Sequence, residues 1–399
     1  MSPKKRRKPD RGRTSTRGGA HAVTPLAVAL REAPRLTGTD RLIVKLVASS
    51  WLGLAWSTRD TVATDAEGDL VREIARAQRS RPDRAGAALA ALAAIAVPPW
   101  GDEARAALPA AASADSDGPP RPVSARRWSD AWDSERLYVL AYAEPVPHSV
   151  VVKAVMLDGV VVEELVVEVP GESTPPPEDS ARDDIDAVLA EVADALRQTD
   201  ELWPARDDGE YSEARAFARW LVQGAPRLVE PRPSLSAAER AWMVDELVAR
   251  RWPWSRLDEP TVRQFARIFI RYGERLLFAG PLAWSPTAAV HFLLDWFPAE
   301  VSVDPEVGSE VPALLSVWVQ IALERRGLTQ EHIDEVVEAV VSVEDEFTES
   351  LPDPEWDAFR EEITRRVEAE GSTLRNGAAV HRAVLAHYAE ADPPPPSEG

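Results

Sequence analysis

His291 and Asp295 are the residues whose types and spacing could do chemistry. They stand four positions apart in a helical pattern, so their side chains share one helix face. An imidazole and a carboxylate placed in this way could share a proton or give two ligands to a metal ion. A hydrogen-bonded pair on a packed or exposed helix explains the same spacing, since no third ligand lies nearby in the sequence. With His148 as a distant contributor, the pair is a candidate ligand or metal site, and we assign no catalytic residue.

Sequence motifs of the common enzyme classes are missing from the chain. It contains no GxGxxG, Walker A, HExxH, GxSxG or EF-hand pattern. It also has no Cys, which excludes disulfides and thiolate metal sites. We therefore favour a non-enzymatic protein and predict no cofactor.

A basic N-terminus is the second feature of the sequence that could bind a ligand. Eight Lys or Arg residues and one Asp give the first 18 residues a net charge of +7, whereas the remaining 381 carry 38 basic and 65 acidic residues, a net −27. A disordered arm of this kind displaces counterions from phosphates, which predicts polyanion binding, for example to nucleic acid. A solubilising tail that lies on the acidic body is the alternative. The predicted binding residues are Lys4, Lys5, Arg6, Arg7, Lys8, Arg11, Arg13 and Arg17.

The helix expected to position His291 and Asp295 covers residues 285–298. Ser285 caps it, Pro286 opens it and Pro298 closes it. A second helix over 310–326 has an equally narrow polar stripe. The two helices predict the core of a C-terminal helical domain.

The middle of the chain changes from helical to strand periodicity. Segments rich in Val and Tyr at 137–143, 150–157 and 160–169 predict a three-stranded antiparallel meander. Asp158-Gly159 predicts a two-residue hairpin turn, which would set Lys153 opposite Glu164. An amphipathic helix over 184–196 would cover the sheet.

These patterns predict a mainly α protein in which helical N- and C-terminal regions flank a small α+β insert. The hydrophobic content of 45% and the 14 Trp residues favour folded domains over disorder. Pro-rich stretches indicate the boundaries. The expected divisions are a disordered basic arm (1–21), a helical domain (22–110), a linker (111–127), an α+β domain (128–200), a helical domain (203–390) and a disordered tail (391–399).

Nothing in the sequence predicts association with a membrane. No run of about 20 apolar residues is present, as a transmembrane helix would need. The basic start is not followed by the apolar core of a signal peptide. We expect a protein of the bacterial cytoplasm, with which the absence of Cys is compatible.

The region around the candidate pair resembles a group of uncharacterised actinobacterial proteins with the passage SP…FLLDW(L/F)P…W…RRGL. The matching residues here are Ser285-Pro286, Phe292 to Pro298, Trp318-Val319 and Arg325 to Leu328. In that group the passage follows a short β-rich region with a histidine, here His148. The resemblance covers roughly residues 130–350; it implies architecture and origin, and no activity. The chain also uses Arg more often than Lys, which is typical of GC-rich genomes such as those of actinobacteria.

We expect a non-enzymatic binding or scaffolding protein whose acidic helical body meets an unknown protein partner while the basic arm binds a polyanion. The alternative is an enzyme or a small-ligand or metal-binding protein with a site assembled around His291 and Asp295.

Overall fold

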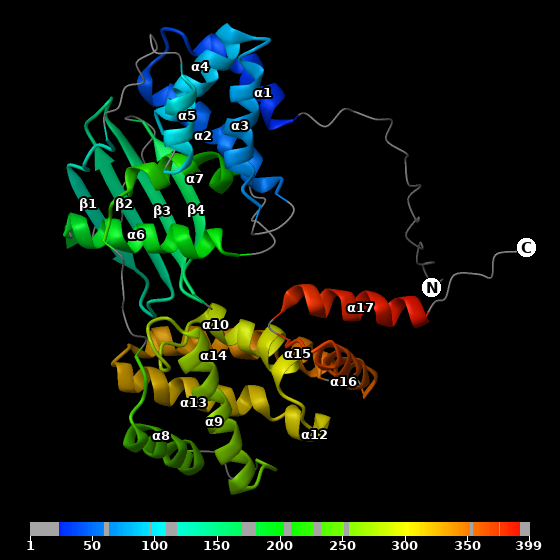
Figure 1. Cartoon of the computed structure of the whole chain (residues 1–399). Helices are drawn as coiled ribbons and strands as arrows, with labels where there is room; N and C mark the ends of the chain where they lie inside the picture. The colour runs from blue at the N-terminus through cyan, green and yellow to red at the C-terminus, as the bar shows by residue number, and fades with distance from the viewer. Residues whose placement is uncertain are drawn as a thin grey trace, which may run out of the picture. The chain divides into compact units, whose positions relative to one another are not determined.

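The structure is a computed structural model that describes residues 24–391 except 60–63, 96–97, 109–117, 158, 170–180, 183, 203–208, 227–232, 251–254, 352–353 and 375. Most of it is helical, with one antiparallel sheet in the middle of the chain (Figure 1). The chain forms two compact units. Unit 1 comprises residues 1–121, 142–147 and 202–223, and unit 2 comprises the remainder. The predicted basic arm (1–21) and most of the predicted tail lie outside the described residues.

Unit 1 is a group of helices built from distant parts of the sequence. Its elements are α1 (Pro25–Glu32), the 3₁₀ helix η1 (Ala33–Leu36), α2 (Arg41–Ser57), α3 (Ala66–Ala77), α4 (Pro82–Ala93), α5 (Trp100–Ala107) and α7 (Glu210–Leu221). Asp40 and Asp65 cap α2 and α3 and accept hydrogen bonds from the first turns of these helices.

Helix α7 packs closely on α2, although the sequence analysis placed it in the C-terminal helical domain. A Cβ added to Gly53 would lie 1.9 Å from the backbone oxygen of Ser212, so only glycine allows this approach. The Phe217 N–H donates to Ser49 Oγ at 3.0 Å across the same interface. Residues 202–223, which include α7, belong to unit 1, and the domain boundaries expected from the sequence stay a prediction. The sequence pattern of α7 predicts an amphipathic helix, but it does not show which other helix α7 contacts.

The interior of unit 1 contains charged side chains. Arg215 Nη1 lies 2.7 Å from Glu67 Oε1, and these residues are 2% and 5% exposed. The guanidinium groups of Arg215 and Arg59 lie 4.7 and 4.3 Å from the Trp56 ring centroid, which adds cation–π attraction. Helices α3 and α7 are thereby joined through a buried ion pair beside an indole of α2.

The sheet of unit 2 has four main antiparallel strands and a two-residue fifth strand in the order β4-β3-β2-β1-β5. They are β1 (Ser124–Ser129), β2 (Glu135–Tyr142), β3 (His148–Val155), β4 (Val161–Glu168) and β5 (Ala181–Arg182). Helix α6 (Ile185–Asp200) covers one face (Figure 1). The mainly helical fold with an α+β insert is confirmed, and the number of strands is corrected from three.

Strand β1 was missed because its sequence, SARRWS, lacks the β-branched alternation of a typical strand. Its start was assigned to the linker 111–127. Contacts from elsewhere in unit 2 stabilise it: Arg127 of β1 and Arg136 of β2 both pair with Glu191 of α6. Tyr138 also donates to Glu191 at 2.9 Å. The strand therefore depends on long-range partners that a local pattern does not record.

The hairpin between β3 and β4 keeps the predicted opposition of Lys153 and Glu164. A β-bulge between Lys153 and Ala154 shifts the register nearer the turn, so Leu157 bridges to Leu277 and does not face Val160. The ammonium of Lys153 pairs with Glu163 at 2.6 Å and Glu135 at 3.2 Å.

The C-terminal part of unit 2 is helical. Its elements are α8 (Ala237–Arg250), α9 (Glu259–Leu276), α10 (Pro286–His291), the π-helical segment η2 (Phe292–Trp296), α11 (Phe297–Glu300), α12 (Pro305–Gly308), α13 (Val311–Arg326), α14 (Gln330–Ser342), α15 (Glu344–Ser350), α16 (Pro354–Ala369) and α17 (Gly377–Ala391). None of the described helices is both long enough and apolar enough to cross a membrane.

The helix that begins at Pro286 was predicted to end at Pro298, but in the structure it continues through this proline. An ordinary helix would suffer a clash between the proline ring and the carbonyl four residues earlier. Here η2 precedes the proline with wider bonding: the Phe297 N–H reaches the carbonyl of Phe292, five residues back. This local widening accommodates Pro298 inside α11.

Candidate functional site

Helix α9 separates an aromatic core from a row of arginines. Asp258 caps the helix, accepting from the Thr261 N–H at 2.9 Å, and Pro260 occupies its first turn. Its inner face carries Phe269 and Tyr272, which are fully buried against aromatic rings of η2 and α13. The heavy burial of that face fixes which side of α9 is turned outward.

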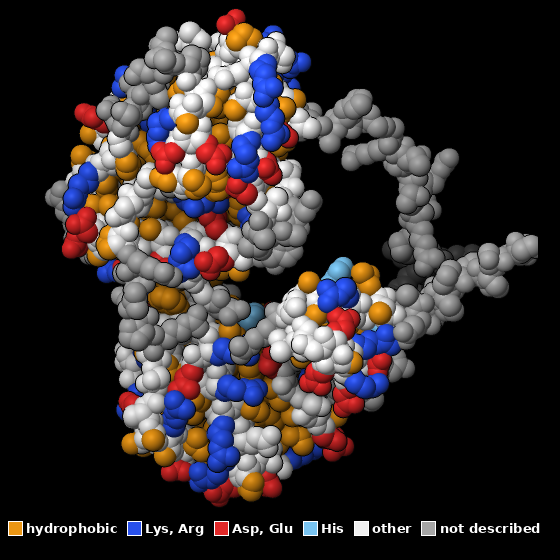
Figure 2. All heavy atoms as spheres, in the orientation of Figure 1, with side chains coloured by type: hydrophobic (Ala, Val, Ile, Leu, Met, Phe, Trp, Pro, Cys, Tyr) orange, Lys and Arg blue, Asp and Glu red, His pale blue; other side chains and the backbone are white. Residues whose placement is uncertain are grey.

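The outward side of α9 carries Arg263, Arg267, Arg271 and Arg275. A spacing of four residues places them in one row along the helix. At a rise of about 1.5 Å per residue, successive arginines are roughly 6 Å apart along the axis and the row is roughly 18 Å long. Figure 2 shows Lys and Arg side chains gathered over the surface of α9.

These arginines line one side of a groove of about 800 Å³ between α8 and α9, which we call the arginine groove. Arg240 of α8 lines it too, and Val244 and Ile270 give it an apolar base. Its described lining holds five Arg, one Asp and one Glu, a local net charge of +3 in a chain whose total is −20. The groove is therefore a cationic region on an acidic protein.

Carboxylates hold some of the arginines in place. Arg240 pairs with Glu274 at 2.7 Å across the groove. Arg263 pairs with Asp245 at 2.7 Å and with Glu259 at 2.9 Å, and these hydrogen bonds, that of Asp245 first, raise the pKa of Arg263. Exposed pairs of this kind add little stability, since water solvates their charges almost as well. Their main effect is to orient the guanidinium groups.

Arg267 and Arg271 are the exposed arginines in the middle of the row. Arg271 lies over the Trp296 ring, 5.2 Å from its centroid, and this cation–π attraction restrains the guanidinium. Arg267 makes no hydrogen bond or ion pair within the part of the chain that the structure describes. Two guanidinium groups at the centre of the groove are thus available for a bidentate bond to an anion such as phosphate.

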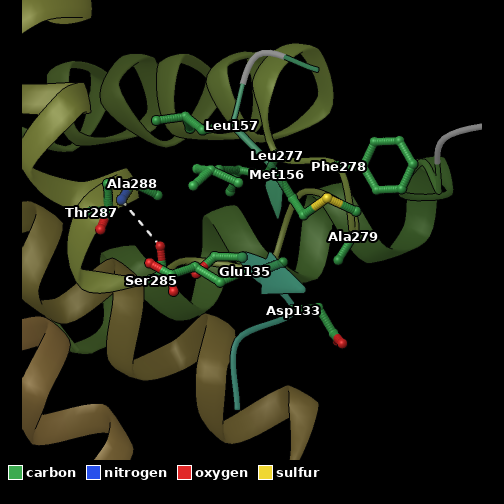
Figure 3. Close-up of a pocket in the computed structure, with 13 residues that line it drawn as sticks. Asp133, Glu135, Met156, Leu157, Leu277, Phe278, Ala279, Ser285, Thr287 and Ala288 are labelled. Atoms are coloured by element: carbon green, nitrogen blue, oxygen red, sulfur yellow. Dashed lines mark hydrogen bonds between the residues drawn. The ribbon is translucent and has the colours of Figure 1, made fainter. Parts of the chain in front are cut away.

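A second, much smaller cavity lies where α10 begins (Figure 3). Ser285 and Thr287 line it together with Asp133 and Glu135, and the Ala288 N–H donates to Ser285 Oγ at 3.1 Å. Its volume of about 10 Å³ is comparable to the space needed by one water molecule. We therefore treat it as a packing gap between the sheet and the helices of unit 2.

The predicted pair His291 and Asp295 does not form a joint site by hydrogen bonding in the described structure. The Tyr272 hydroxyl donates to the Ala288 carbonyl at 2.9 Å, and His291 Nδ1 lies 3.0 Å from the same hydroxyl oxygen. Asp295 is exposed within η2. The histidine is thus tied to the aromatic core, and the ligand-site hypothesis stays a prediction.

His148, the distant contributor, is the first residue of β3 and is 3% exposed. Among the described residues, no group of three or more His, Asp or Glu side chains could hold a metal ion. The eight predicted polyanion-binding residues between Lys4 and Arg17 lie outside the described residues.

The arginine groove was not predicted, although part of its signal is visible in the sequence. Arg263, Arg267, Arg271 and Arg275 recur every four residues between apolar positions. The contribution of Arg240 could not be read in this way, because it depends on how α8 packs on α9. Comparison of the chain with protein-family models, curated proteins and solved structures finds no match to any of them.

Proposed function

We propose that the protein is a non-enzymatic binding protein that holds the phosphate backbone of a nucleic acid in the arginine groove, with the basic N-terminal arm as a second contact. The observation that carries this proposal is that five arginines line one groove of about 800 Å³. Phosphate oxygens accept two parallel hydrogen bonds from a guanidinium, and contacts to the backbone are independent of base sequence.

The linear arrangement favours a chain of charges over a single small anion. Arg263 to Arg275 form a row, whereas a site for one phosphate needs donors that converge on one point. Successive phosphates of a strand would meet successive arginines along α9. Arg240 on α8 would limit the strand from the opposite side of the groove.

The charge on the rest of the chain affects how the affinity for a polyanion would depend on salt concentration. Residues 19–399 carry a net −27, which repels a polyanion at long range. At about 0.15 M salt the Debye length is about 8 Å, so the repulsion is largely screened while close contacts in the groove remain. The +7 arm would assist the first encounter.

The test compares the full chain with an Arg267→Ala/Arg271→Ala variant, using labelled single-stranded RNA and duplex DNA in fluorescence anisotropy. At about 50 mM salt we expect the variant to bind about tenfold more weakly. On the single strand, the slope of log affinity against log salt should become shallower by about 1.4, because about 0.7 is lost with each phosphate contact.

Arg365→Ala is the matched control, since it removes an exposed arginine from α16 outside the groove. It should leave both affinity and slope unchanged. A chain without residues 1–18 separates the two contacts: a loss confined to this deletion would assign binding to the arm alone. Absence of binding by the nuclease-treated full chain at about 50 mM salt would refute the proposal.

A further inference from the structure

A hollow of about 760 Å³ opens in unit 1, far larger than the water-sized gap of unit 2. Its volume falls within the range of about 300–1,000 Å³ that is typical of small-molecule sites. Residues of η1, α2, α4 and α7 line it, together with the turn between β2 and β3, which belongs to unit 1.

The floor of the hollow is one face of α4. Ala87, Ala90, Ala91 and Ala94 recur at the spacing of a helix face, and only their methyl groups project from it. The opposite face of α4 is fully buried through residues such as Leu89. A helix that is apolar on all sides is normally covered on all sides. The alanine face instead meets open space among the described residues.

The walls of the hollow add further apolar surface. Leu36 of η1, Val44 of α2 and the indole of Trp220 of α7 line it, as do Pro120 and Pro145. Trp220 is almost fully buried, so its ring is held by unit 1 and only an edge or face is presented to the hollow. The surface as a whole suits an apolar body such as an alkyl chain or an aryl ring.

Two cations lie on one wall. Arg41 and Lys45 are one turn apart on α2, and both line the hollow. Lys45 Nζ lies 3.8 Å from the centroid of the Trp220 ring and donates to the Ala94 carbonyl at 2.9 Å. These contacts hold the ammonium beside the apolar floor. Glu144 is the one carboxylate among the described lining residues, so cations exceed anions there.

From this combination we propose that the hollow of unit 1 binds a small organic carboxylate with an apolar body, of the class of medium-chain acyl or aryl carboxylates. The apolar body lies along the alanine face of α4. The carboxylate lies toward Arg41 and Lys45, where charge-assisted hydrogen bonds form. This site is separate from the arginine groove in sequence, unit and ligand, so either proposal can fail without the other.

Isothermal titration calorimetry of the full chain with decanoate and with decanol tests both halves of the site. We expect decanoate to bind with a dissociation constant below about 1 mM and more tightly than decanol. Lys45→Met keeps the apolar stem and removes the charge, so decanoate should bind about tenfold more weakly while decanol changes less than about twofold. Lys45→Arg should retain most of the decanoate affinity.

Ala90→Phe fills the hollow and should abolish binding of both probes. Ala106→Leu on α5 and Arg79→Met after α3 are controls outside the hollow, and neither should alter binding. Thermal unfolding of each variant confirms that it folds, and decanoate should raise the midpoint only where the hollow is intact. The proposal is overturned if the full chain does not bind decanoate at about 1 mM, or if Lys45→Met and Ala90→Phe bind it as well as the full chain does.

Discussion

Two sets of arginines, one in each unit, stand in opposite environments. In unit 1, Arg215 is 2% exposed, paired with Glu67 and stacked on Trp56. In unit 2, Arg267 and Arg271 stand exposed on α9, and neither has an ion pair among the described residues. The same type of side chain is part of the interior at Arg215 and part of the solvated surface at Arg267 and Arg271.

Hydration explains why the buried arginine is paired with a carboxylate and the exposed arginines are not. A buried guanidinium has lost its water, so it needs a fixed carboxylate, and loss of that partner leaves an uncompensated charge. An exposed guanidinium remains hydrated and can exchange water for an anionic ligand at modest cost. Burial therefore distinguishes arginines that stabilise the fold from arginines that are available for binding.

The largest effect is expected for Glu67→Gln, which removes the carboxylate charge that pairs with the buried guanidinium of Arg215 at 2.7 Å. Unit 1 should lose about 3–5 kcal/mol of its free energy of unfolding, as measured by urea denaturation. The double variant Arg215→Met/Glu67→Leu removes both charges and should recover most of that loss. A loss below about 1 kcal/mol for Glu67→Gln would mean that water reaches the pair, and the contrast between the units would disappear.

An intermediate case would sharpen the comparison within unit 2. Arg326 of α13 donates to the Trp132 carbonyl at 3.0 Å and to the Asp133 carboxylate at 2.7 Å, which fixes the turn between β1 and β2. Its side chain is 19% exposed and that of Asp133 is 41% exposed, so water weakens the pair. Arg326→Met should cost about 1 kcal/mol in denaturant unfolding. If Arg326→Met lowers the free energy of unfolding as much as Glu67→Gln does, the cost of losing an ion pair does not depend on how exposed the pair is.

The smallest effect on stability is expected for Arg267→Ala. It should change the free energy of unfolding by less than about 0.5 kcal/mol, because the side chain is exposed and has no described partner to lose. Its melting temperature should stay within about 2 °C of that of the unchanged chain. A clear destabilisation would identify Arg267 as a structural residue and would weaken the case for the arginine groove as a binding site.

Local signals in the sequence located many helices well. Ser285 was expected to cap a helix, and it accepts a hydrogen bond from the Ala288 N–H in the first turn that follows it. A cap and its partners lie within a few residues of each other, so the pattern contains the whole interaction. The opposition of Lys153 and Glu164 was predicted for the same reason, although the bulge beside it was not.

Interactions between distant residues account for what was missed. Strand β1 is stabilised by β2 and by Glu191, about sixty positions later in the chain, and its own sequence does not resemble a strand. Helix α7 was predicted as a helix, but its partner α2 lies far back in the sequence. The candidate site followed the same rule: the row on α9 could have been read from its spacing, whereas the groove needs Arg240 of α8.

The return of α7 to α2 has a consequence for how the chain is made. Roughly 160 residues separate the end of α2 at Ser57 from the end of α7 at Leu221, and synthesis at about 5–20 residues per second needs roughly 8–30 s to add them. During that interval Gly53 and Trp56 lack their contacts with α7, so the nascent chain exposes the surface of α2 that α7 later covers. Unit 1 is thus begun first on the ribosome and is completed only after the sheet has been synthesised.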